Sequence, residues 1–474
     1  MADLFRRKPI GAAERHGNRL PPTLSWPHLV ALGVGAIVGT GILTLIGVGA
    51  DRAGPSVLLS FAIAGAVCAC AALAYAELAA MMPAAGSAYS YAYAALGEIF
   101  AWVVGWSLIL EYSLVVSTVA VGWSGYASPL LMGLGFPVEL TRGPELGGLI
   151  NLPAIFIIAV VSGLLLLGTR ESARVNTVLV AVKIVTLSLF VAVALPHFDT
   201  AHLSPFMPYG FGATPGPDGI QRGVMAAAAI IFFAFYGFDA ISTAAEETKR
   251  PERDLAIGIL GSMCACTLIY IVVAAAAIGA VPFAGFADSP EPLALILRQL
   301  GRPGVAHVVA TAAVIALPTV LLAFLYGQSR IFLAMARDGF LPRSLATISK
   351  RGTPARITMA TAILVAILAG LLPIGEIAAL ANAGTLIAFM AVGACLILLR
   401  RRRPDLKRPF RVPAAMLVGS GAVAGCLYLF ASLPSRTLLW CLFWNIIGLA
   451  IYLGYARHHS ALSDGEQETG SAAG

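Results

Sequence analysis

The sequence predicts an all-α polytopic membrane protein with 12 transmembrane helices, and three observations carry this prediction. The 474 residues are 59% hydrophobic and only 12% charged, whereas soluble domains are about 25% charged. Mean hydropathy is +0.86, and apolar stretches long enough to cross a bilayer follow one another with short connections. Two of these stretches are interrupted near their middle by glycine. We therefore expect a single membrane domain and no separate soluble domains.

The membrane domain is expected over residues 29–456, between a basic N-terminal segment (1–28) and a polar tail (457–474). The first 28 residues are polar and basic and do not resemble a cleavable signal peptide. The expected spans are 29–50, 55–82, 97–127, 148–169, 173–195, 223–246, 255–282, 304–336, 357–373, 375–399, 412–431 and 437–456.

The net charge of +7 follows the expected topology. Most of the 31 Lys and Arg fall in segments on one side of the membrane, with dense groups at 6–8, 249–250, 350–351 and 400–403. The positive-inside rule then places both termini in the cytoplasm, in a plasma (inner) membrane. The basic clusters are read as orientation signals and contacts with the lipid bilayer, and nucleic acid is not expected as a partner.

No metal site, cofactor or enzymatic centre is expected. The seven cysteines lie almost entirely in apolar stretches, and the two Cys-Ala-Cys pairs would point to different sides of a helix, so we read them as small buried residues. No nucleophile elbow, phosphate loop or metal-ligand cluster accompanies the spans.

The first span carries the densest group of glycines, five within residues 33–47. Each glycine lowers helix propensity by about 1 kcal/mol relative to alanine. Backbone without helical bonds is tolerated at membrane depth only where protein or a wet cavity surrounds it. We therefore predict a helix break at Gly39–Gly41, and tight helix packing at Gly33 and Gly47.

The sixth span contains a second interruption, where Gly237 and Asp239 lie beside four aromatic residues. Broken helices at the first position of two successive five-span groups are typical of inverted-repeat transporters, here about 29–195 and 223–399 with extra helices over 412–456. The positive end of a half-helix favours a carboxylate ligand. Aspartate is a favoured N-cap, so Asp239 is expected to cap the second half-helix.

Lys183 lies near the middle of the fifth span. A central lysine costs at least ~2.5–3.5 kcal/mol for insertion, so it needs a partner or a function. Burial disfavours the charged amine, so Lys183 could gain and lose a proton during a working cycle. The alternative is snorkelling to the cytoplasmic side, but that side is ~15 Å away along the helix.

Other charged residues are assigned by their position. Glu111, in the middle of the third span on a stripe of small and polar residues, faces substrate, belongs to a proton path, or is protonated and bonds a neighbouring helix. Glu246 and Glu247 are expected to pair with Lys249 and Arg253 as a cytoplasmic latch. Pro318-Thr319 predicts a break or a simple kink near Lys183.

Several motifs resemble the amino acid–polyamine–organocation superfamily, and within it most closely the cationic amino acid transporter family. They cover spans one to ten, although Arg250 stands where Asn is common and Ala256 where Pro is common. The motifs are Gly39–Ile42, Ser204–Gly210, Phe233–Asp239, Glu246–Arg253, Tyr326–Arg330 and Met335–Pro342.

The resemblance implies a substrate site and a coupling site. Backbone around the first break would bind a substrate carboxylate, at Ile37, Gly39, Thr40 and Gly41. Backbone carbonyls at the second break would receive the substrate ammonium, at Phe233, Ala234 and Tyr236. It also implies an acid at Glu111 near the substrate pocket, and places Lys183 where sodium-coupled relatives hold a sodium ion.

The function expected from these features is a secondary active amino acid transporter, a proton-coupled symporter working by alternating access. The substrate is an amino acid, neutral or cationic, with neutral or broad specificity favoured because Lys183 already adds positive charge near the site. An exchanger with Lys183 as a fixed charge remains open, and so does a non-transporting amino acid sensor.

Overall fold

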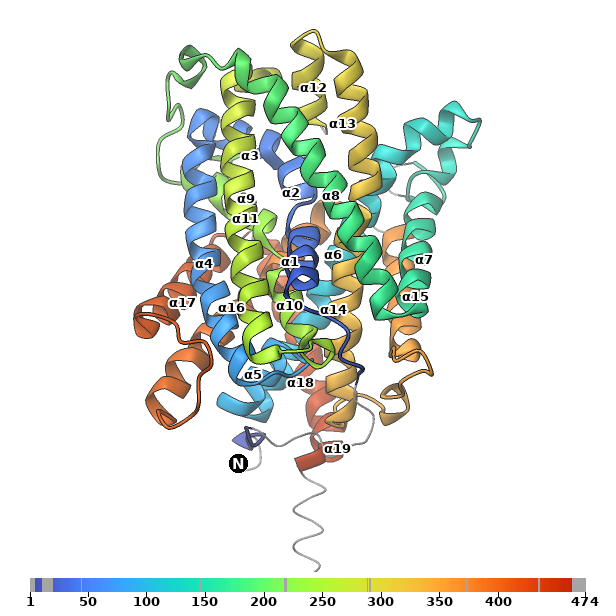
Figure 1. The fold of residues 1–474 in the computed structure, drawn as a ribbon, viewed down its shortest axis with the longest axis vertical. Helices are drawn as coiled ribbons and strands as arrows, with labels where there is room; N and C mark the ends of the chain where they lie inside the picture. The colour runs from blue at the N-terminus through green and yellow to red at the C-terminus, as the bar shows by residue number, and fades with distance from the viewer. Residues whose placement is uncertain are drawn as a thin grey trace, which may run out of the picture.

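The computed structural model describes residues 5–10, 20–43, 45–144, 147–216, 220–287, 289, 291–371, 374–433 and 435–462. Figure 1 shows a bundle of helices with the N-terminus and α19 (Arg457–His459) at its lower end, and α12 (Pro292–Gln299) at its upper end. We call the lower end the terminal face and the upper end the distal face. Both chain ends meet at Asp338, which receives Lys8 Nζ at 2.6 Å through its carboxylate and the amide of Ala461 at 3.0 Å through its carbonyl.

Within these residues, eight helical stretches are long and apolar enough to cross a membrane: Leu45–Met81, Glu98–Gly133, Ser172–His197, Val224–Thr243, Pro251–Ala280, Pro303–Arg337, Leu380–Arg402 and Ser435–His459. Shorter apolar helices occupy Trp26–Ile37, Leu152–Leu167, Ala355–Leu371 and Ala415–Ala431. The polytopic helical architecture is as expected. The count of 12 spans and the inverted repeat stay predictions. The predicted tail beyond residue 462 lies outside the described residues.

The first span is divided, as the glycine pattern predicts. It consists of α1 (Trp26–Ile37), α2 (Thr40–Leu43) and α3 (Leu45–Ala53), and Val38 has extended backbone with φ −75° and ψ 98°. The packing role predicted for Gly33 is confirmed, because a Cβ there would lie 2.4 Å from Ser262 Oγ. At Gly47 a Cβ would lie 3.0 Å from the carbonyl oxygen of Ala287.

The sixth span is also divided. Helix α9 (Val224–Ile231) continues into the 3-10 turn η7 (Phe232–Phe235), and α10 (Phe238–Thr243) follows after Gly237. Gly237 has φ +107°, a left-handed conformation that only glycine adopts without strain. In Figure 1, α1 and α10 occupy the part of the bundle nearer the terminal face, and α2, α3 and α9 lie toward the distal face.

Long helices surround the two divided ones: α4 (Val57–Met81), α6 (Glu98–Gly133), α7 (Leu152–Leu167), α8 (Thr169–Ala194), α11 (Pro251–Ala280), α13 (Pro303–Ala316), α14 (Pro318–Arg337), α15 (Ala355–Leu371), α16 (Ile374–Arg402), α17 (Ala415–Ala431) and α18 (Ser435–Ile451). Helix α1 packs against α8, α10, α11 and α14. This central position explains why it is apolar on all sides.

Short elements connect these helices. They are η2 (Gly54–Ser56), α5 (Ala88–Ala95), η3 (Val138–Leu140), η5 (Leu195–His197), η6 (Thr200–Leu203), η8 (Ala245–Glu247), η9 (Phe283–Gly285), η10 (Arg343–Leu345) and η11 (Tyr452–Ala456). Strands β1 (Thr214–Pro215) and β2 (Gln221–Arg222) pair antiparallel on the distal side of α9.

Candidate functional site

The two helix breaks lie directly against each other. A Cβ on Gly41 would lie 2.5 Å from Ala234 Cβ, and a Cβ on Gly237 would lie 2.5 Å from Ala36 Cβ. Any larger residue at Gly41 or Gly237 would therefore push the breaks apart. Peptide groups at a helix end lack some intrahelical partners, so this contact gathers backbone groups from several helix ends inside the bundle.

Tyr270 on α11 bridges the two breaks. Its hydroxyl is within hydrogen-bond distance of the carbonyl oxygens of Ile37, at 2.6 Å, and Ala234, at 2.8 Å. Both carbonyls belong to the predicted substrate site, so Tyr270 is a functional candidate that the sequence analysis missed. The available signal was one hydroxyl in the middle of an apolar span, and buried tyrosine hydroxyls usually have a partner.

Lys183 on α8 reaches the first break. Its side chain is 2% exposed, and its amine donates to the carbonyl oxygen of Gly35 at 3.1 Å and to that of Val38. The amine also donates to Thr319 Oγ1 on α14 at 2.6 Å, and Thr319 Oγ1 lies 3.0 Å from the same Gly35 oxygen. Lys183 is thus fully buried and does not snorkel. Helix α13 ends at Ala316 and α14 begins at Pro318, so the helix is interrupted just before the Pro-Thr pair, and the Thr319 hydroxyl reaches Lys183.

Glu111 on α6 lies on another side of the breaks, against α16. A Cβ on Gly384 would lie 2.9 Å from Glu111 Cβ, so the two helices are in close contact there. Glu111 is fully buried, and within the described residues neither carboxylate oxygen has a hydrogen-bond partner. A buried carboxylate without donors is costly unless it is protonated or binds a ligand.

Two tyrosines connect the second break to neighbouring helices. Tyr112, next to Glu111, donates to the Asp239 carboxylate at 2.5 Å, and Asp239 also accepts from the Gly237 amide at 3.2 Å. The prediction that Asp239 caps α10 is wrong, because the N-cap is Gly237. Asp239 lies two residues further on, in the first turn, and its carboxylate accepts from the amide of the capping glycine. The Tyr236 hydroxyl donates to Asn382 on α16, and the ring of the half-buried Phe233 lies 5.0 Å from that of Tyr236.

The predicted site residues thus lie around the two helix breaks, on different sides of them. Ile37, Gly41 and Ala234 meet at the breaks, Lys183 lies on the α8 side, and Glu111 on the α6–α16 side. At Gly39, a Cβ would lie 2.6 Å from Val320 on α14. The Thr40 side chain lies outside the described part of the structure. Among the described residues, no group of three or more His, Cys, Asp and Glu could hold a metal ion.

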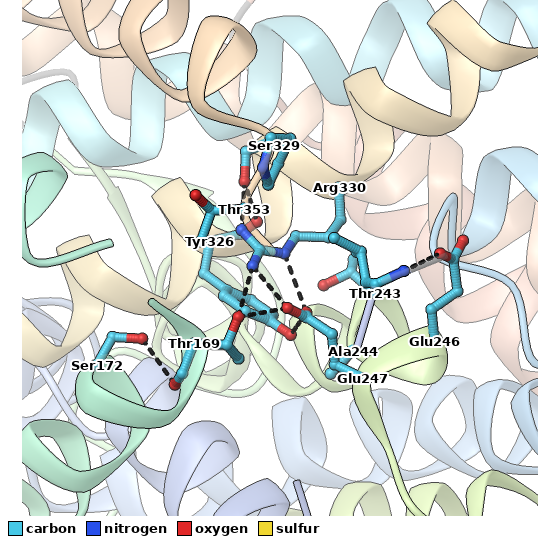
Figure 2. Close-up of polar contacts among 12 residues, drawn as sticks. Thr169, Ser172, Thr243, Ala244, Glu246, Glu247, Tyr326, Ser329, Arg330 and Thr353 are labelled. Atoms are coloured by element: carbon cyan, nitrogen blue, oxygen red, sulfur yellow. Dashed lines mark hydrogen bonds and ion pairs between the residues drawn. The ribbon is translucent and has the colours of Figure 1, made fainter. Parts of the chain in front are cut away.

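The predicted partners of the acidic pair at the end of the sixth span are wrong. Figure 2 shows Glu247 paired with Arg330, whose Nη2 lies 2.9 Å from Glu247 Oε1. Glu246 pairs with Arg337, with Nη1 2.7 Å from Oε1. Both arginines come from α14, far along the chain, whereas Lys249 and Arg253 are near only in sequence.

Fold and site together define a multi-pass helical membrane protein in which two interrupted helices meet at a buried polar centre. The chain belongs to the amino acid permease family, whose model matches residues 24–452. This membership confirms the resemblance found in the motifs.

Curated relatives cover most of the chain. It is 44% identical to the branched-chain amino acid permease BcaP of Bacillus subtilis (strain 168), over 97% of this chain and 99% of the relative. It is 40% identical to the methylthioribose transporter of the same organism, over 98% and 100%. It is 38% identical to the vacuolar cationic amino acid transporter 2 of Arabidopsis thaliana, over 85% and 64%. The names of these relatives describe permeases and transporters, in agreement with the expectation that the chain is not an enzyme.

Proposed function

We propose that this protein is a proton-coupled amino acid symporter that works by alternating access in a plasma (inner) membrane, with the terminal face in the cytoplasm. The single observation that carries the proposal is the contact of Lys183 with the end of α1. Family membership supports transport, and the lysine contact supports the proton as the coupling ion.

The chemistry of this contact links protonation to helix position. A charged lysine amine has three hydrogens to donate, and Lys183 has three oxygen acceptors, on Gly35, Val38 and Thr319. Neutral Lys183 has one hydrogen fewer and can donate to only two of these three oxygens. Loss of the proton therefore weakens the tie between α8 and α1, and ligand-dependent differences of this kind shift a two-state equilibrium.

The proposed substrate is a neutral amino acid, held by backbone at the two breaks. The carboxylate would bind at Gly39–Gly41, and the ammonium at the carbonyls of Phe233, Ala234 and Tyr236. Glu111 lies beside the second break with no hydrogen-bond donor among the described residues, which suits a pocket-facing acid or a proton carrier. The 44% identity to a branched-chain amino acid permease makes leucine the first substrate to test.

The test is uptake of radiolabelled leucine, alanine, arginine and lysine into proteoliposomes, with and without an inward proton gradient. We expect accumulation of leucine only with the gradient, and none for Lys183→Ala under the same conditions. Gradient-independent accumulation by the unmodified protein, or an unchanged pH dependence in Lys183→Ala, contradicts proton coupling. If uptake requires a preloaded amino acid, the protein is an exchanger and Lys183 is a fixed charge.

A second candidate function is transport of a thiosugar, favoured by the 40% identity to a methylthioribose transporter over nearly the full length of both chains. Methylthioribose has neither carboxylate nor ammonium, so it would not use the backbone groups in the same way. Competition separates the two: excess methylthioribose leaves leucine uptake unchanged under the first proposal. Binding of leucine without any uptake would instead indicate a sensor.

A further inference from the structure

The Glu247–Arg330 ion pair is fully buried at the terminal face of the bundle. The two side chains are 0% and 1% exposed, respectively, and the contact is bidentate. Arg330 Nη2 lies 2.9 Å from Oε1 and Nε lies 3.1 Å from Oε2 of Glu247. The guanidinium also lies over the Tyr326 ring, 3.8 Å from its centroid.

Glu247 joins parts of the chain that are far apart in sequence. Its carboxylate accepts from Thr169 Oγ1, at the start of α8, at 2.5 Å, and from the Tyr326 hydroxyl on α14. Its backbone oxygen accepts from the amides of Thr23 and Leu24, both at 2.8 Å. These two residues lie just before Ser25, the N-cap of α1. Figure 2 shows the side-chain contacts converging on Glu247 from the two helices.

The helices joined here are also those joined at Lys183. Thr169 and Lys183 both lie on α8, about 21 Å apart along its axis. Thr319, which contacts Lys183, and Arg330 both lie on α14, about 16 Å apart. One tie therefore holds α1 to α8 and α14 at the break. The other holds the N-terminal end of α1 and the C-terminal end of α10 to the same two helices at the terminal face.

A buried ion pair is suited to a two-state element. Removing both charges from water is expensive, so such a pair contributes little net stability, but a single unpaired buried charge is strongly unfavourable. Glu247 and Arg330 can satisfy their charges in two ways only: paired with each other in the closed arrangement, or hydrated after the helices separate. Intermediate arrangements leave a buried charge without a partner.

We propose that Glu247 and Arg330 form a latch that closes the terminal-face entrance to the helix breaks, and that the pair separates each time this entrance opens. The inference rests on the proposed alternating-access function. Thr169 and Tyr326 act as positioning residues, since each holds the Glu247 carboxylate toward Arg330 through one hydroxyl. In the transport cycle, the latch sets how often the site opens on that face.

Accessibility of a buried position next to the latch tests this proposal. Ser172 lies one turn inside Thr169 on α8 and is 2% exposed, and its hydroxyl donates to the Thr169 carbonyl of the same helix, 3.0 Å away. A Ser172→Cys reporter is reacted with a water-soluble maleimide in the purified full chain. Mass spectrometry of the peptide containing residue 172 gives the labelling rate.

Glu247→Gln keeps the shape of the side chain and leaves Arg330 with no carboxylate. We expect the labelling rate at position 172 to rise about tenfold or more, because the closed state then contains an unpaired buried charge. The double change Glu247→Gln/Arg330→Met should bring the rate back toward its starting value. Glu291→Gln is the matched control, since it breaks the exposed Arg298–Glu291 pair near the distal face and should leave labelling unchanged.

A labelling rate for Glu247→Gln within about twofold of the Glu291→Gln control overturns the latch. If Glu247→Gln does not fold, Thr169→Val and Tyr326→Phe each remove one donor to the carboxylate and should raise labelling several-fold. If the labelling rate rises in neither variant, this result also overturns the latch. The labelling measurement does not depend on transport. If labelling rises in Glu247→Gln but the protein takes up no amino acid, the proposed function alone is contradicted. If proton-driven uptake is normal but labelling does not rise in Glu247→Gln, the latch alone is contradicted.

Discussion

The amine of Lys183 on α8 lies 2.6 Å from the hydroxyl of Thr319 on α14. Lys183 also donates to α1 at the first break, so this contact adds α14 as a second helix bound by the same amine. Thr319 lies in the first turn of α14, directly after the interruption between α13 and α14, so the lysine contact falls at this interruption.

Replacing Thr319 with valine should reduce proton-driven leucine uptake about tenfold or more, because a hydrogen bond to a charged group contributes about 1.5–3 kcal/mol. Initial uptake rates in proteoliposomes under an inward proton gradient measure the effect. Thr361→Val is the matched control, since the Thr361 hydroxyl, among the residues that the structure describes, binds only carbonyls of its own helix α15. Equal rates in the two variants would argue against Thr319 as a partner in coupling.

Replacing Tyr270 with phenylalanine should raise the KM for leucine about five- to tenfold, since a neutral hydrogen bond contributes about 1 kcal/mol. The change removes the donor shared by the Ile37 and Ala234 carbonyls and lets the two breaks shift relative to each other. Tyr428→Phe, at a half-exposed position on α17, should leave KM unchanged. An unaltered KM in Tyr270→Phe would show that the bridge does not shape the substrate site.

Gly237→Ala should abolish uptake or reduce it severely. Gly237 has φ +107° and a Cβ there would lie 2.5 Å from Ala36 Cβ, so alanine adds backbone strain of about 1–2 kcal/mol to a steric clash between the breaks. Gly163→Ala provides the comparison, because a Cβ at that position on α7 meets nothing within 4 Å. The measurement is uptake normalised to folded protein by size-exclusion chromatography. Normal uptake by Gly237→Ala would contradict the close contact of α1 and α10.

Glu77→Gln should lower stability by about 3 kcal/mol, because it leaves arginine charges without their partner. Glu77 is buried on α4 and contacts Arg400 at 2.6 Å and Arg408 at 3.3 Å, while also accepting from the Val412 amide at 2.7 Å. Thermal unfolding in detergent, followed by loss of the monodisperse peak, should show a lower midpoint. Glu252→Gln, which affects an exposed pair with Lys407, should not shift it.

The local features of the site follow from the sequence because they depend on short stretches of chain. Gly39–Gly41 and Gly237 predict the two breaks, since glycine weakens a helix wherever it lies. Lys183 can be identified from the sequence because it is a charged residue within an apolar span. By contrast, the predicted ion-pair partners of Glu246 and Glu247 were wrong, because they were chosen from basic residues nearby in sequence. The observed partners on α14 lie 91 and 83 residues away.

The sequence alone therefore determined the membrane class, the approximate positions of the apolar helices, the two breaks and the buried charges. Each of these depends on composition and propensity within a window of about 20 residues. Only the tertiary structure decided which helices face one another, and with them the partners of each polar group. Tyr270 meets Ala234 across 36 residues, and Lys183 meets Thr319 across 136. Helices that are apolar on all sides carry no stripe to mark the contacting face, so packing of whole helices selects these pairs.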